Sequence, residues 1–410
     1  MMAFLPQARG QEAPAAEAPV GLNPEVPSQV AAASSYSVNF VPIPEIITDP
    51  NEGNTYGVLG VWLIVDERDE IRYMVAPDVR YNDTKGLFPT VRLFGYPTPS
   101  RAYSITVGKS TTKDEDYTLD FLDRALWGGD AFVSLSLEHG RDSTERFFGF
   151  GNNSKENEES NYTAQDTIAQ ATPGIWIGHG FNLSYRMRIR RFAVQLGQVK
   201  SLPFIGSEHP ETADRGLEPG VYWAHAVALT YDTRDAVDVP AAGTLARAYT
   251  EVADRDLGSS TSFVKFGAEA ARFQPLFGGN PVLALRARLD YTSGSSDTPF
   301  WEMFSLGGHR YLRGFGSGRF YDFNRSLATM ELRTRVWQTH LFGINAEIEI
   351  APFVEAGQVF SGITDSPVSN LHWVYGAGFR GIARPRVVGF VDIGYGTEGV
   401  AIFTGIDYPF

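Results

Sequence analysis

Charged side chains recur at every second position in several segments of this sequence, with apolar side chains between them. The charged positions of this pattern include Arg186, Arg188, Arg190, Arg286, Arg288, Arg333, Glu331, Glu347, Glu349 and Glu355. Because successive side chains of a β-strand point to opposite faces, each segment predicts a strand with one apolar and one charged face. Charges of both signs share the polar face, which suits a wet lumen filled by ion-paired side chains.

The residue types that perform covalent catalysis or bind metals are either missing or not spaced as such chemistry requires. The sequence has no Cys, which excludes a disulfide scaffold, a thiolate zinc site and a cysteine nucleophile. The seven His are scattered without an H-E-x-x-H pattern, and no G-x-S-x-G occurs. Residues 376–381 match G-x-G-x-x-G, but they lie inside a strand pattern with no helix after it. We therefore expect no enzyme, no metal and no cofactor.

Composition and hydropathy narrow the class of protein. The 410 residues include 48 acidic and 35 basic side chains, and the net charge of −13 argues against nucleic-acid binding. The strongest apolar run, Gly57–Val65, is nine residues long, whereas a spanning helix needs about 20. A helical membrane protein is therefore excluded. A membrane β-barrel remains, because its apolar residues alternate and give no hydropathy peak.

The chain divides into a tail and a long region of period two. Residues 1–52 are rich in Pro, Ala and Glu and predict a flexible low-complexity tail, either a signal-peptide remnant or an ordinary disordered tail. Residues 53–410 predict an all-β fold, a single transmembrane antiparallel barrel. We count 17 candidate strands, centred on Leu63, Met74, Leu93, Thr106, Leu119, Ser134, Ile168, Arg188, Ala228, Tyr249, Phe266, Arg286, Met330, Ile348, Gly376, Val391 and Thr404. Since single-chain bacterial barrels have even strand numbers, we expect 16.

Three segments carry a resemblance to a known family. They are LTYDTRDAVDVPAAG (229–243), FSLGGHRYLRGFGSGRF (304–320), and FVEAGQVF (353–360) with YGAGFRG (375–381) after it. In this order they resemble the bacterial surface antigen family, the barrel domain of BamA- and TamA-type outer-membrane assembly factors and two-partner secretion transporters. The resemblance is good over residues 200–410 and weaker upstream, through RFFGFGNNS (146–154). It implies a member that lacks the periplasmic POTRA domains.

The resemblance implies a lock inside the lumen. In the family, the loop that carries L-R-G-F folds back into the barrel, where its Arg pairs with carboxylates on the wall. Here these residues are Leu312, Arg313, Gly314 and Phe315, and the matching wall acid is Glu355, with Glu331, Glu347 and Glu349 as alternative partners. Because Glu is longer than the Asp more usual there, the contact could be re-registered or water-mediated. We expect Gly314 to adopt a positive φ. An ordinary charged loop tip is the alternative for Arg313.

Two further motifs belong to the same resemblance. The family signature turn is Tyr231, Asp232, Arg234, Asp235, Pro240 and Gly243, and we interpret it as a conformational signature and not a reactive site. The C-terminal signal by which the assembly machinery accepts a barrel is Gly405, Tyr408 and Phe410. Phe403 stands where a polar residue is expected, which weakens the match.

Two functions from different classes follow. The first is an outer-membrane protein of a Gram-negative bacterium that assembles, inserts or translocates other proteins, dependent on partners because soluble domains are absent. Its expected partners are outer-membrane lipids, periplasmic or outer-membrane assembly proteins and unfolded barrel substrates, with no nucleic acid. The second is a passive outer-membrane channel or structural barrel, suggested by the charged lumen face.

Overall fold

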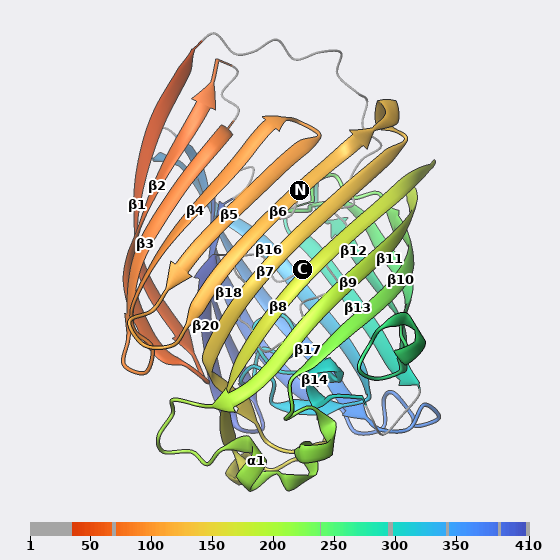
Figure 1. Ribbon diagram of the computed structural model, residues 1–410. Helices are drawn as coiled ribbons and strands as arrows, with labels where there is room; N and C mark the ends of the chain where they lie inside the picture. The colour runs from red at the N-terminus through yellow and green to blue at the C-terminus, as the bar shows by residue number, and fades with distance from the viewer. Residues whose placement is uncertain are drawn as a thin grey trace.

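In a computed structural model, alternating sequence segments form one nearly closed antiparallel sheet (Figure 1). The structure describes residues 35–67, 71–237, 239–293, 298–341, 344–383 and 387–406. Consecutive barrel strands pair with one another, and β13 pairs directly with β16. The strands are β1 (Tyr36–Asp49), β2 (Gly53–Asp66), β3 (Ile71–Asn82), β4 (Gly86–Thr98), β5 (Arg101–Lys109), β6 (Glu115–Leu126), β7 (Ala131–Phe147), β8 (Ser160–Gly178), β9 (Phe181–Leu196), β10 (Gly220–Asp232), β11 (Gly243–Ala253), β12 (Phe263–Pro275), β13 (Val282–Ser293), β16 (Asn324–Leu341), β17 (Ile344–Phe360), β18 (His372–Ala383), β19 (Val387–Gly396) and β20 (Gly399–Ile406).

The single antiparallel barrel is confirmed, but the expected count of 16 strands is wrong. The sheet has 18 strands, and each of the 17 predicted centres lies in one of them. The missing strand is β1, within residues 1–52 that were expected to form a tail. Tyr36–Asp49 pairs with β2 along its whole length, so the sheet includes these residues. Residues 1–34 lie outside the described part of the chain.

Outward side chains are apolar and exposed over much of the sheet. On β2 they include Tyr56, Val58 and Trp62, and β9 and β19 continue the pattern with Met187 and Tyr395. A face of this kind is stable when it meets lipid and would be a liability in water. No helix in the described ranges is long and apolar enough to span a membrane.

The connections differ in length at the two ends of the barrel. One end has short turns such as His179–Gly180, and the other has the long connections 148–159, 197–219 and 294–323. Figure 1 shows the long connections gathered with α1 (Ile205–Glu208) and β14 (Phe304–Leu306) at one end. We call these the short-turn end and the long-loop end.

The seam between the first and last strands is held differently from every other strand pair. Among the described residues, β1 and β20 form no ladder. Thr48 N–H donates to Thr404 Oγ1 at 3.0 Å, and the Thr404 hydroxyl donates to the Ile46 carbonyl at 2.7 Å. A side chain thus joins the two edges where backbone groups join the other strands.

Candidate functional site

The site is built on the connection between β13 and β16, of which residues 298–323 are described; we call them the lumen loop. β14 and β15 (Phe320–Asp322) form a two-stranded sheet within it. Phe300, Trp301 and Tyr321 of the loop belong to a buried cluster with β7–β12. Other buried apolar side chains of the loop form a second cluster with four residues of the wall, Leu327, Phe353, Val359 and Val374. The members from the loop are Leu306, Tyr311, Leu312, Phe315 and Phe320. The loop therefore packs against β16, β17 and β18.

Arg313 lies at the centre of this contact and is fully buried. Its backbone N–H donates to Glu355 Oε2 at 2.6 Å, and its Nε donates to Glu355 Oε1 at 3.0 Å. Its Nη1 donates to Glu331 Oε2 and to Asp392 Oδ2, both at 3.0 Å. The guanidinium carbon stands 3.5 Å from the centroid of the Phe353 ring. One planar cation thus joins the loop to β16, β17 and β19.

Two wall arginines share the carboxylates of this cluster. Arg333 Nε donates to Glu331 Oε1 at 2.7 Å. Arg380 Nη1 donates to Glu331 Oε1 at 2.8 Å and to Glu349 Oε1 at 3.0 Å. Four carboxylates, those of Glu331, Glu349, Glu355 and Asp392, therefore face three guanidiniums. Without Arg313 the cluster would hold four negative charges against two positive ones. The part of the wall that contacts Arg313 is therefore anionic.

Glycines allow the loop backbone to lie directly on the wall. A Cβ on Gly394 would stand 2.2 Å from the Arg313 carbonyl oxygen, and a Cβ on Gly314 would stand 2.7 Å from Val374 Cγ2. The expected positive φ at Gly314 is wrong. The left-handed residue is Leu312, with φ 84°, a conformation that costs a branched side chain about 1–3 kcal/mol. Gly314 is required by close approach and not by its φ.

The predicted partners of Arg313 separate into two groups. Glu355 and Glu331 contact it, and the contact to Glu355 is direct in spite of the longer side chain. Glu349 pairs instead with Arg380, and Glu347 lies near Arg335 at 3.5 Å. Sequence reasoning missed Asp392. The sequence did contain a signal for it, because the alternation of side chains along β19 places Asp392 on the inward face with Gly394.

Comparison with known proteins identifies the family of this chain. Residues 101–382 match the model of the Omp85 superfamily domain. The chain belongs to the Omp85 superfamily. A BamA structure from Haemophilus ducreyi lacking POTRA domains 1–3 matches 90% of the chain and 75% of its own length, with 12% identity and a TM-score of 0.55. CdiB from Escherichia coli matches 90% and 67%, with 12% identity and a TM-score of 0.60. At this identity the two structures show the shared fold alone. Among curated protein sequences none matches the chain.

The signature turn of this Omp85 barrel joins β10 to β11 at the short-turn end. Arg234 Nη2 donates to Asp232 Oδ2 at 2.8 Å. Asp235 Oδ1 accepts from three backbone N–H groups, including that of Ala241 at 2.9 Å. Gly243 has φ 104°, and a Cβ there would stand 2.2 Å from the Thr233 carbonyl oxygen. These contacts support the conformational interpretation of the turn. Tyr231, the residue before the last of β10, packs against Phe181, and Pro240 is buried beside Val239.

The expected C-terminal signal of the Omp85 chain is described only in part. Gly405 lies in β20, where a Cβ would stand 3.0 Å from the Phe390 ring. Tyr408 and Phe410 lie outside the described residues. Phe403, where a polar residue was expected, is buried on the inward face with Phe390.

The arginines expected to line a pore all lie on the inward face of the Omp85 barrel, and each has an acidic partner. Arg286 Nε donates to Glu269 at 2.5 Å, and Arg288 Nε donates to Asp290 at 2.7 Å. Arg325, which was not predicted, also donates to Asp290. The lumen face is thus a network of ion pairs and not a set of free cations.

The long-loop end fastens the lumen loop of the Omp85 barrel from outside. Arg319 Nη2 donates to the Ser154 carbonyl at 2.8 Å and pairs with Glu398 at 2.6 Å. Asn152 Oδ1 accepts the N–H of Val359 at 3.0 Å. The connection 148–159, which includes residues 148–154 of the upstream motif, therefore covers the loop.

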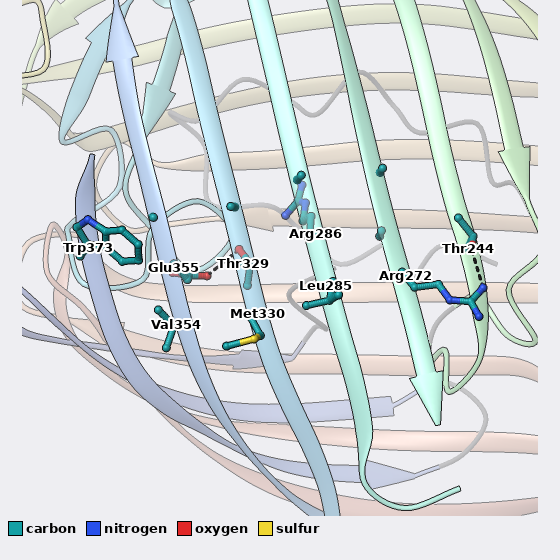
Figure 2. A pocket seen from close by; sticks show the side chains of 14 residues that line it. Thr244, Arg272, Leu285, Arg286, Thr329, Met330, Val354, Glu355 and Trp373 are labelled. Carbon is teal, nitrogen blue, oxygen red and sulfur yellow. Dashed lines mark hydrogen bonds between the residues drawn. The ribbon is translucent and has the colours of Figure 1, made fainter. Parts of the chain in front are cut away.

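The outer face behind the anionic wall has a shallow hollow of about 500 Å³. Small side chains of four neighbouring strands stand in register along it: Ala270, Ala287, Ala328 and Ala356. Figure 2 shows Leu285, Met330 and Val354 beside it, and Arg272 at one edge donating to Thr244 Oγ1 at 2.9 Å. The hollow lies on the opposite side of the sheet from the Glu355 carboxylate.

Proposed function

We propose that this protein is an outer-membrane barrel of a Gram-negative bacterium that inserts or translocates other proteins. The observation that carries the proposal is the lumen loop, whose buried Arg313 holds it against three wall strands. Loss of the Arg313 contacts weakens the attachment of the loop to these strands, and release of the loop opens a path through the lumen. The apolar outward face supports the placement in a membrane.

The seam supports a second route, from the lumen sideways into the membrane. For the part of the seam that the structure describes, opening it requires the loss of the hydrogen bonds of Thr404 and not of a whole ladder. An opened strand edge carries free backbone groups that can pair with an incoming strand. The partners that this proposal implies are outer-membrane lipids, assembly proteins of the periplasm or outer membrane, and unfolded barrel substrates.

Two prolines limit how the β1 edge pairs. Thr48 N–H and the Ile46 carbonyl point to β20, so the even-numbered residues of β1 face the seam. The unbroken register with β2 gives Pro42 and Pro44 the same direction. Proline has no N–H to donate, and it is tolerated in a strand where that position faces an open edge. A partner strand at the seam therefore finds no backbone donors at positions 42 and 44.

Reconstitution tests the proposal. Purified protein in liposomes is expected to accelerate the folding of an added barrel substrate, and deletion of its gene is expected to perturb outer-membrane assembly or secretion. Arg313→Ala, which frees the loop, is expected to change both results, whereas Glu218→Ala, at an exposed position of a long loop, serves as the control. The proposal is abandoned if neither folding in liposomes nor the outer membrane of the deletion strain is affected.

A passive channel is the second candidate, and the charged inward face favours it. Planar-bilayer conductance separates the two. A closed or flickering wild type that opens in Arg313→Ala supports the fastened loop. A large, steady conductance that is the same in both proteins supports a plain channel.

A further inference from the structure

The lumen loop carries another fully buried charge, of opposite sign to Arg313, which contacts other wall strands. Glu302, in the short turn Phe300–Glu302, is fully buried. Arg188 donates to both of its oxygens, through Nη1 at 3.0 Å and Nη2 at 2.9 Å. Arg190 Nη1 donates to Oε1 at 3.0 Å, and Lys265 Nζ donates to Oε2 at 2.7 Å. Three cations from β9 and β12 therefore bind one carboxylate of the loop.

The wall that receives Glu302 has more positive charge than its own acids balance. Arg186, Arg188, Arg190 and Lys265 contribute four positive charges. Within the described ranges, two wall acids are seen to pair with them: Glu251 with Arg186 and Arg188, and Asp166 with Arg190. Counted over these described residues, the excess is two without Glu302 and one with it. We call these four cations and two acids the cationic wall.

Arg186 shows that this wall can donate more hydrogen bonds than it does. The residue is 6% exposed and points into the lumen beside Arg188. Its Nη2 bonds Glu251, whereas its Nε and Nη1 meet no hydrogen-bond acceptor in the described part of the chain. A buried guanidinium with unused donors is costly unless an anion satisfies it. The wall is thus suited to bind a carboxylate in addition to Glu251.

We propose that the cationic wall is a carboxylate-binding site of the lumen and that Glu302 occupies it as an internal ligand. Its external ligands are the acidic side chains of an unfolded polypeptide that enters the lumen when the loop leaves. The inference rests on the proposed withdrawal of the loop. The guanidiniums of β9 and the ammonium of Lys265 supply the forked and single donors that bind carboxylates in proteins.

The proposal also explains why the loop carries charges of both signs. Glu302 and Arg313 neutralise walls of opposite charge, cationic at β9 and β12 and anionic at β16, β17 and β19. When the loop withdraws, each wall regains an excess of two charges. A polypeptide with acidic and basic residues can pair with both walls, whereas a neutral or uniformly charged solute pairs with one at most. The loop thus makes the ion pairs with both walls that such a polypeptide would make after the loop withdraws.

Binding of a labelled hexaglutamate peptide to the full chain in detergent tests the site. The matched pair is Arg313→Ala with Glu302→Ala against Arg313→Ala with Glu218→Ala. Both lack the Arg313 contact and lose one carboxylate, but only the first vacates the wall. We expect the first to bind hexaglutamate about tenfold tighter or more, because a tethered competitor acts at an effective concentration of about millimolar. Added salt should weaken the binding, and hexalysine should show no such gain.

Two further measurements keep the test decisive. Heat-modifiable migration on gels shows whether each variant is folded, and Arg313→Lys with Glu302→Gln replaces the alanine pair if that pair does not fold. Adding Arg186→Met and Arg188→Met should abolish the gain. Equal hexaglutamate binding by the matched pair overturns the proposal. Failure of the transport proposal is a separate result, because peptide binding requires no transport.

Discussion

Replacing Arg313 by Met is the most informative perturbation of the lumen loop. Methionine keeps much of the apolar stem but removes hydrogen bonds to Glu355, Glu331 and Asp392. Glu331 keeps two arginines, whereas the side-chain partner left to Glu355 is Thr329, at 3.4 Å. Removing one partner of a buried ion pair costs about 3–5 kcal/mol, which corresponds to a shift of roughly 150- to 4,000-fold toward the released loop.

Single-channel recording in planar bilayers measures that shift. In wild type we expect rare, brief openings, and in Arg313→Met a rise in open probability of the size just given, up to saturation. Arg313→Lys keeps the charge but loses the planar fork, and it should fall between the two. Adding Glu355→Gln to Arg313→Met removes the uncompensated carboxylate and should restore part of the closed state. An open probability in Arg313→Met equal to that of wild type would refute the assignment of this cation as the fastener.

Three other outcomes follow from the structure. Gly394→Ala places a Cβ 2.2 Å from the Arg313 carbonyl and should open the channel, whereas Gly389→Ala on the same strand meets open space and should not; conductance that fails to distinguish them contradicts the close approach. Replacing Pro42 and Pro44 by Val returns two donors to the seam edge, each worth about 1 kcal/mol once paired, so the folded band should persist to a higher temperature on gels; an unchanged transition would show that these donors stay unpaired. Burial raises the pKa of Glu302, but Arg188, Lys265 and Arg190 hold it well below its ordinary value of 4.5, so its stabilisation is present above that value and is lost as the pH falls through the lower pKa of the folded state. Conductance should therefore be constant from about pH 5 to 8 and rise only under stronger acid; a rise near neutrality would contradict this.

Most of the sheet could be predicted because alternation is a local property. Each of the 17 centres lies in a strand, since a lipid-facing and a lumen-facing side chain must alternate along every strand. β1 escaped because Pro42 and Pro44 made its sequence look like part of the Pro-rich tail. Both prolines lie at even-numbered positions, which face the seam. An edge strand tolerates proline there because no neighbouring strand needs the missing N–H group. With this interpretation of the prolines, the segment VPIPE (41–45) would have indicated the eighteenth strand.

The site was less accessible than the fold. Arg313 and Glu355 came from a resemblance between motifs, and no local rule could have paired residues 42 positions apart. Asp392 and Gly394 lie on a strand that meets the loop only after the barrel closes, so their roles depend on distant register. Glu302 gave no signal either, because its three cations lie on β9 and β12. Long-range partners of this kind require the assembled structure.

The turn between β1 and β2 joins the loop to the seam. Asn51 Nδ2 donates to the Ser317 carbonyl at 2.6 Å, and the Asn51 carbonyl accepts from Arg146 Nη2 at 2.6 Å. The strand that forms one side of the seam is thus anchored to the segment that fills the barrel. Thermodynamic linkage makes the effect of such an anchor reciprocal: if withdrawal of the loop changes the free energy of separating β1 from β20, that separation changes the free energy of withdrawal by the same amount. The two proposed exits from the lumen, along its axis and through its side, would then be coupled and not independent.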